Sequence, residues 1–206
     1  MRKLLVLAAM LLAAGAVPAG AVIPPGSVTI SASRPVVVFG GSLGLSGKIS
    51  SHQAGQTVSV AAEAFPATTF TEVAMVTTTS GGAWKYSATP LIQTSYQAQW
   101  NTSTSRTVTV KVRPRIALTL QSRTARRGTF SVKVSGERSF AGKYVLIQRL
   151  SSTGTSTVRH VVLGAGSSAT FTVRLPKHRA RLRAVMPASQ AAPGYIAGYS
   201  NVWRSS

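Results

Sequence analysis

The chain has 206 residues, of which 23 are Lys or Arg and three are Glu, with no Asp, so its formal net charge is +20. A hydrophobic content of 44% suffices for a packed core and excludes an intrinsically disordered chain. The absence of Cys excludes disulfides, thiolate metal sites and lipid attachment through cysteine, and the length allows one or two domains.

The first 21 residues have the features of a secretory signal peptide. Arg2 and Lys3 supply a charged start, an apolar stretch follows over residues 4–14, and Ala19-Gly20-Ala21 forms a cleavage site. A membrane-anchoring helix is the alternative, but the apolar stretch is short for a membrane span. We therefore predict cleavage after Ala21, a short leader over residues 22–26, and a protein that is secreted or associated with the cell surface.

The rest of the chain shows the alternation of β-strands, and no segment has a sustained helical period. Turn signals such as Gly40-Gly41 and Ser80-Gly81-Gly82 separate the alternating runs. Short strands at this spacing predict an all-β sandwich. Apolar residues alternate in three early runs: Leu43, Leu45 and Ile49; Val58, Val60 and Ala62; and Trp84, Tyr86 and Ala88.

The stretch from Ser105 to Leu120 marks a joint between two such units. Alternating valines end at Arg113, and a second alternating run begins at Ile116. Pro114 lies between them and cannot donate to the ladder of a central strand, so we expect one domain to end before it. A short proline-containing link of this kind also predicts few contacts between the two domains.

The order of turns and strands repeats at an offset near 87 residues. Ala54-Gly55 with Val58 and Val60 matches Ala141-Gly142 with Val145 and Ile147. Trp84 and Tyr86 likewise match Phe171 and Val173. Units of this length are full domains rather than solenoid repeats. We predict two tandem β-sandwiches, one over residues 27–113 and one over residues 114–206.

These motifs resemble the immunoglobulin-like and fibronectin type III-like repeats of secreted bacterial, notably actinobacterial, surface proteins. The resemblance covers nearly all of the mature chain and implies a structural role for Trp84, beside the role that Pro114 has at the joint. It also implies that Tyr96 forms a tyrosine corner, its hydroxyl bonding to nearby backbone. The second unit departs from the pattern, with Leu182 at the corresponding position. Such modules act as spacers, adhesins or carbohydrate-binding appendages more often than as enzymes.

Candidate catalytic and metal-binding residues are few. Ser42 lies in a G-x-S-x-G sequence, but a strand-like run follows it where a nucleophile elbow needs a helix. The three imidazoles are His52, His160 and His178, and the nearby carboxylates are too few for a converging ligand set. We therefore predict a protein that is not an enzyme and holds no metal or cofactor.

The positive charge is concentrated in the second unit. Residues 22–113 hold six basic residues and two Glu, whereas residues 114–206 hold fifteen basic residues and Glu137 alone. With Leu182 and Ala184 facing the core, the intervening arginines should point outward beside Arg174. The predicted basic row is Arg174, Lys177, Arg179, Arg181 and Arg183. It is either a binding surface for a polyanion or a solvated face that keeps the protein soluble.

The expected partner follows from the charge and from the export signal. An anionic cell-wall polymer, an acidic polysaccharide or an anionic membrane surface would each be attracted. A nucleic acid is disfavoured, because the chain leaves the cytoplasm and shows no recognition helix or aromatic RNA-binding motif. The alternative hypothesis is a structural spacer or a protein–protein interaction module without polyanion binding.

A long loop over residues 187–199 is the second candidate for a contact surface. Long loops in compact domains are commonly functional. Tyr195 and Tyr199, with Trp203 beyond them, could stack against sugar rings. In the alternative, these tyrosines fold back with Ile196 and cap the open end of the sandwich.

Overall fold

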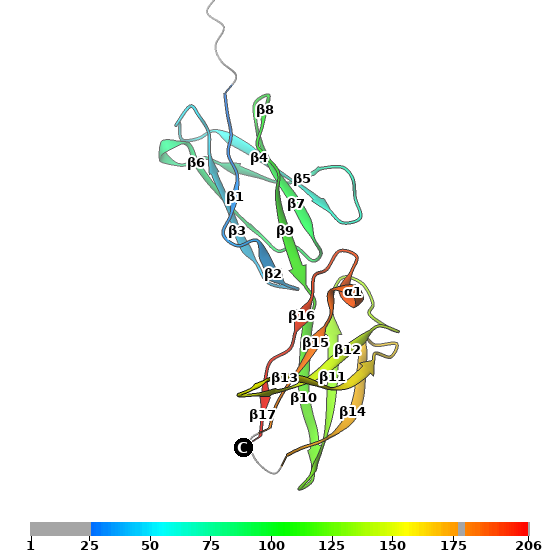
Figure 1. Cartoon of the computed structure of the whole chain (residues 1–206). Coiled ribbons are helices and arrows are strands. Elements are labelled where there is room, and N and C mark those ends of the chain that lie inside the picture. The colour runs from blue at the N-terminus through cyan, green and yellow to red at the C-terminus, as the bar shows by residue number, and fades with distance from the viewer. Residues whose placement is uncertain (1–25, 177–179, 206) are drawn as a thin grey trace, which may run out of the picture.

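A computed structural model describes residues 26–176 and 180–205, and these residues form an almost entirely β structure (Figure 1). The predicted signal peptide and leader residues 22–25 lie outside the described residues. The strands form four sheets, two before Pro114 and two after it. The prediction of an all-β chain with tandem sandwiches is therefore confirmed. We refer to residues 26–113 as the first half and to residues 114–205 as the second half.

The first half contains a three-stranded and a six-stranded sheet. The three-stranded sheet has the order β1 (Ser31–Ala32), β3 (Leu43–Lys48), β6 (Ala83–Ala88). The larger sheet has the order β2 (Val36–Val38), β9 (Val108–Arg113), β7 (Thr94–Trp100), β4 (Thr57–Ala64), β5 (Thr71–Thr77), with β8 (Ser103–Thr104) beside β7. A short 3-10 turn, η1, spans Ser80–Gly82. The alternation predicted for β3, β4 and β6 places Leu45, Val58 and Trp84 in the core.

The second half repeats this arrangement. Its three-stranded sheet has the order β10 (Arg115–Arg123), β11 (Arg127–Ser135), β14 (Ser168–Arg174). The other sheet has the order β13 (Gly154–Val162), β12 (Tyr144–Ser151), β15 (Arg181–Met186), β16 (Gly198–Tyr199), with β17 (Trp203–Arg204) also paired to β15. The helix α1 spans Ala188–Ala191. Phe130, Phe140 and Leu182 are fully buried in its core.

The two glycines that mark the repeat occupy equivalent places. Gly55 and Gly142 have φ angles of 78° and 77°, a region that glycine adopts without steric cost. The Gly55 N–H donates to the carbonyl of Thr78, and the Gly142 N–H donates to that of Leu163, both at 2.9 Å. Each glycine therefore begins the same turn before the strand pair β4–β5 or β12–β13.

Tyr96 and Trp84 are structural residues of the first core. Trp84 is 1% exposed and Tyr96 is 4% exposed. Desolvation raises the pKa of the Tyr96 hydroxyl to about 12, with a smaller contribution from Tyr86, and a hydrogen bond with the Thr94 side chain opposes the rise. The tyrosine predicted from the repeat pattern is therefore a buried, protonated side chain of strand β7.

The segment over residues 187–199 folds back onto the first half. The Gln93 N–H donates to the carbonyl of Gly194, and the Ile196 N–H donates to that of Val112, both at 3.0 Å. Arg138 anchors the C-terminal end of α1 by donating to the carbonyls of Ala191 and Ala192 at 2.6 and 2.8 Å. The expectation of few contacts between the halves is wrong, because this loop supplies backbone bonds across the joint.

Figure 1 shows the two halves stacked end to end, with β9 running directly into β10 at Pro114. At the joint Arg115 faces Ser135, and at the other end of the same strand pair Arg123 faces Gly128. We call that other end, farthest from the first half, the distal end. In the described part of the chain no helix combines the length and the apolar character that a membrane crossing requires.

Candidate anion-binding site

Two arginines face each other across strands β11 and β14 at the distal end. Arg127 and Arg174 are register partners in this antiparallel pair. Residues directly opposite have Cβ atoms about 4.5–5.5 Å apart and point to the same face, and like charges in that position are destabilising. Phe171 and Val173 face the core, so both guanidinium groups lie on the outer side, where both arginines are exposed. We call these residues the first arginine pair.

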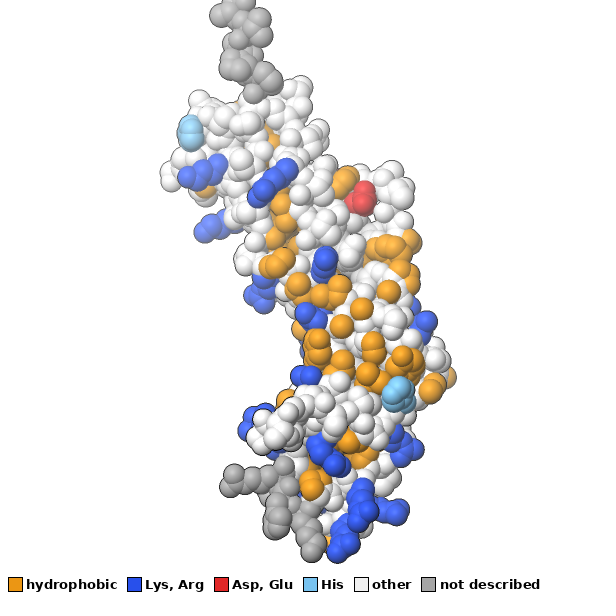
Figure 2. Space-filling view, viewed as in Figure 1, with side chains coloured by type: hydrophobic (Ala, Val, Ile, Leu, Met, Phe, Trp, Pro, Cys, Tyr) orange, Lys and Arg blue, Asp and Glu red, His pale blue; other side chains and the backbone are white. Residues whose placement is uncertain are grey.

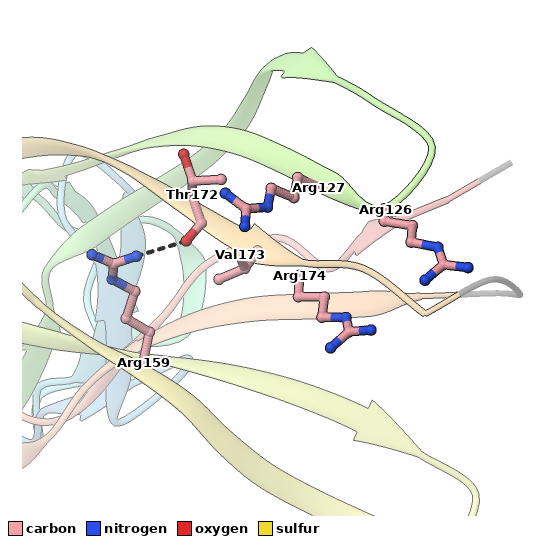
Figure 3. Close-up of a pocket in the computed structure, with 6 residues that line it drawn as sticks. All are labelled: Arg126, Arg127, Arg159, Thr172, Val173 and Arg174. Carbon is pink, nitrogen blue, oxygen red and sulfur yellow. Dashed lines mark hydrogen bonds between the residues drawn. The ribbon is translucent and has the colours of Figure 1, made fainter.

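Two further arginines line the same hollow, of about 450 Å³, as the first arginine pair (Figure 3). Arg159, from the edge strand β13 of the other sheet, donates to the carbonyl of Thr172 at 2.7 Å. Arg126 lies in the loop before β11, and its carbonyl accepts from the Leu175 N–H at 2.9 Å. The first hollow is lined by Arg126, Arg127, Arg159, Thr172, Val173 and Arg174.

The lining of the first hollow contains four guanidinium groups and no carboxylate. Guanidinium groups stay charged, carry five N–H donors each and accept no hydrogen bonds. Their planar forks match the oxygens of carboxylates and phosphates. The arrangement can therefore bind and orient an anionic group, but it offers no proton acceptor for acid–base chemistry.

The single acidic residue of the second half lies at the opposite end. The Glu137 N–H donates to the Tyr195 hydroxyl at 2.7 Å, and Glu137 lines a hollow at the joint with Leu91 and Tyr96. Its carboxylate therefore does not neutralise the distal arginines. In the view of Figure 2, Lys and Arg side chains occur along the whole molecule, and those at its lower end have no Asp or Glu side chain beside them. Unpaired charges of one sign raise the local concentration of counter-ions.

The basic row expected from the sequence is divided between two sheets. Arg181 and Arg183 point outward as predicted, because Leu182 and Ala184, which alternate with them along β15, are fully buried. Arg174 does not lie beside them: β14 belongs to the three-stranded sheet and β15 to the other sheet. The prediction of one continuous face is wrong, because the chain crosses between the sheets after Arg174. Lys177 and Arg179 lie outside the described residues.

Arg183 is engaged in contacts near the joint. Its Nε donates to the Gln148 Oε1 at 2.9 Å. Its guanidinium lies 5.4 Å from the centre of the Tyr199 ring, and that of Arg113 lies 5.3 Å from the same ring. Cation–π contacts of this kind hold the arginine against the protein surface. Arg183 therefore has a structural role, separate from the first hollow.

The aromatic residues of the predicted loop surface are placed differently from one another. Tyr195 is 4% exposed and packs edge-on against Phe140. It therefore folds back onto the protein, as the alternative of a capping loop expects. Trp203 is half-buried and packs edge-on against Phe130 at 4.9 Å between centroids. Tyr199 is 49% exposed, and its ring is flanked by the two arginines described above. A sugar contact therefore stays a prediction for Tyr199 alone.

Sequence reasoning missed Arg126, Arg127 and Arg159. The dipeptide Arg126-Arg127 before Gly128 was an available signal, since consecutive cations at a turn concentrate charge. Strand β11 was not predicted, so the cross-strand position of Arg127 could not be recognised. Arg159 reaches β14 from the other sheet, and a contact between two sheets cannot be predicted from a periodic pattern within one strand.

Comparison with known proteins identifies no relative by sequence. No family model matches the chain, and no curated protein matches it. A solved structure of a tetra-tandem repeat in the extending region of a large adhesion protein is similar, with 13% sequence identity and a TM-score of 0.37. The similarity covers 87% of this chain and 49% of that one, so this chain spans about half of its length. Similarity at this level does not identify what this chain binds.

Among residues 26–176 and 180–205, no cluster of three or more His, Asp or Glu side chains is placed to hold a metal ion. Ser42 immediately precedes strand β3, which begins at Leu43. The Gly-rich sequence around it therefore leads into a strand, as predicted, and lacks the strand-to-helix turn of a hydrolase nucleophile.

Proposed function

We propose that the chain is a secreted, non-enzymatic module that contacts an anionic extracellular polymer or cell-wall surface through its second half. The observation that carries this proposal is that one hollow is lined by four arginines and by no carboxylate: Arg126, Arg127, Arg159 and Arg174. An anionic cell-wall polymer, an acidic polysaccharide and an anionic membrane surface all present the charges that such a hollow binds. The strand order of the two halves also supports the resemblance to immunoglobulin-like and fibronectin type III-like repeats.

The position of the first arginine pair argues for binding rather than for stability. Two cations opposite each other on neighbouring strands oppose the folded state. A solvated face that serves solubility alone has no need of this arrangement, because charges spread along a strand serve equally well. An anion shared between Arg127 and Arg174 would convert the repulsion into charge-assisted hydrogen bonds.

A rigid spacer is the second candidate, and the joint between the halves favours it. The loop over residues 187–199 donates and accepts backbone hydrogen bonds across Pro114. A module that holds two domains in a fixed orientation can present the distal end at a defined distance from its attachment. In this alternative, the arginines would bind no polyanion.

An array of anionic polymers probed at two salt concentrations distinguishes the two candidates. The parent chain is compared with the double variant Arg127→Gln/Arg174→Gln. The matched control is Arg106→Gln/Lys133→Gln, which removes the same charge from exposed positions outside the first hollow. We expect salt-sensitive binding by the parent and the control, and weaker binding by the Arg127/Arg174 variant. Equal binding by all three proteins, or none by the parent, would leave the spacer as the better account.

A further inference from the structure

A second pair of arginines faces each other in the other sheet of the second half. Arg181 of β15 and Arg204 of β17 are register partners. Both are exposed, whereas Leu182 and the half-buried Trp203 beside them face the core. We call Arg181 and Arg204 the second arginine pair. Among the strand pairings of the described residues, these two pairs are the places where one cation lies directly opposite another.

The second arginine pair also lines a hollow, of about 670 Å³. Its lining includes Leu150, Ala180 and the hydroxyl-bearing residues Ser151, Ser152 and Ser205. The Ala180 N–H donates to the Ser205 Oγ at 2.8 Å, and the Ser205 N–H donates to the carbonyl of Ala180 at 2.9 Å. These two bonds fix the C-terminal strand against β15, so Arg204 is held opposite Arg181.

The two hollows are neighbours at the distal end. The Arg149 Nη2, from β12, donates to the carbonyl of Arg174 in the first hollow at 2.9 Å. Arg149 itself faces Leu182 of β15, and the residue that follows it, Leu150, lines the second hollow. The side chain of Arg149 therefore bridges the two sheets between the hollows. In Figure 1, the turn between β10 and β11 lies at the distal end, and β14 and β17 also approach this end.

We propose that the two arginine pairs form one binding track for a linear polyanion that passes around the distal end from one sheet to the other. The inference rests on the proposed function and specifies its ligand: a flexible chain with repeated negative charges, rather than a single anionic group. Stacked sheets lie about 10 Å apart, so one anion reaches one pair only. A chain that binds one pair reaches the other intramolecularly, at a high effective concentration.

Blocked oligo-glutamate peptides are suitable probes because their length and charge are defined. An extended chain spans at most about 3.3–3.6 Å per residue. The two pairs point outward from sheets about 10 Å apart, so three residues fall short of the path between them, whereas twelve residues, spanning about 40 Å, can follow it. One probe carries twelve Glu. The other carries three Glu followed by nine Gln, and it can fill a single hollow. Binding is measured by titration calorimetry at low salt on the full chain.

The variants remove one pair at a time: Arg127→Gln/Arg174→Gln, Arg181→Gln/Arg204→Gln, and the combination of both. With the twelve-Glu peptide we expect one peptide per chain and a loss of about tenfold or more in either double variant, because losing one pair ends the bivalent contact. The combined variant should also lose the single-hollow binding that each double variant retains, so it should bind more weakly than either of them. With the three-Glu peptide, either double variant should lose about twofold, since the remaining hollow still binds it.

Other outcomes separate the track from the proposed function. Two twelve-Glu peptides per chain, or a twofold loss in each double variant, would show two independent sites and overturn the track. If only the Arg127/Arg174 variant binds the twelve-Glu peptide more weakly, and the Arg181/Arg204 variant binds it like the parent, the track is also overturned. The proposed function would then stand. If the combined variant binds the twelve-Glu peptide like the parent, both are overturned. Circular dichroism of each variant establishes that the comparison is made between folded proteins.

Discussion

The side-chain hydroxyl of Tyr195 donates a hydrogen bond of 2.6 Å to the carbonyl oxygen of Leu91, 104 positions earlier in the chain. The hydroxyl oxygen of Tyr195 also accepts a hydrogen bond from the Glu137 N–H at 2.7 Å. One phenol therefore connects the first half, the loop over residues 187–199 and the turn after β11. Burial raises the pKa of Tyr195, against the effect of the Glu137 backbone bond, so the hydroxyl keeps the proton that it donates.

Replacing Tyr195 with Phe should destabilise the joint while leaving both cores intact. The ring can still pack on Phe140, but two backbone groups lose their partner. We expect a loss of about 0.5–1.5 kcal/mol for each hydrogen bond in the free energy of unfolding, measured with urea. Tyr199→Phe is the control, because the exposed Tyr199 ring makes its contacts through its face. Equal stability of the parent and Tyr195→Phe would contradict this role.

A fragment over residues 114–206 should fold by itself but with reduced stability. It retains its own two sheets and core, and it loses the bonds that join Gly194, Tyr195 and Ile196 to the first half. We expect a cooperative thermal transition of β-rich circular dichroism at a lower midpoint than that of the full chain. A fragment without cooperative unfolding would show that the domain boundary predicted at Pro114 is misplaced.

The strands of the cores could be predicted from the sequence because their apolar residues alternate. The patterns around Val58, Trp84 and Val145 were of this kind, and these residues are buried in β4, β6 and β12. Strand β11 was missed although its buried residues Phe130, Val132 and Val134 alternate in the same way. Strands β5 and β13 were missed for a physical reason. They are edge strands whose residues are mostly exposed on both faces, and such strands carry little hydrophobic alternation.

The candidate site could be predicted only in part, because its residues meet across strands. The outward direction of Arg181 could be predicted from periodicity alone, because its neighbour Leu182 is buried in the core. The opposition of Arg127 and Arg174 depends on the register between β11 and β14, and that of Arg181 and Arg204 on a strand of two residues. A period within one strand says nothing about the register between two strands.

The stability of the protein should fall above pH 10 because of Tyr96. Its folded-state pKa is raised to about 12 from an ordinary value near 10, so the folded chain holds this proton more tightly than the unfolded chain. The stabilisation is complete below about pH 10 and is lost as the pH rises towards 12. Urea unfolding at pH 8–11.5 should show a shallower decline in Tyr96→Phe. Parallel declines in the two proteins would contradict the assignment.

Removing one member of the first arginine pair should not cost stability. In Arg174→Gln the repulsion between the two guanidinium groups disappears, while the backbone pairing of β14 with β11 is kept. We expect a gain of about 0.2–1 kcal/mol at low salt that shrinks as salt is added. Lys133→Gln is the control, because Lys133 faces Ala117 and Ser168. A loss of stability in Arg174→Gln, relative to this control, would indicate that the pair serves the fold.

The most direct test of the account is to map where a polyanion binds on the full-length chain. Backbone amide signals are recorded by NMR with increasing amounts of the twelve-Glu peptide, at low salt and again at high salt. Binding at the distal end should shift the signals of residues 126–128 and 172–175, and binding along the whole track should also shift those of residues 180–182 and 203–205. These shifts should saturate at low salt and vanish at high salt. Shifts spread over the first half, or no shifts at the distal end when the peptide is in excess, would contradict the account.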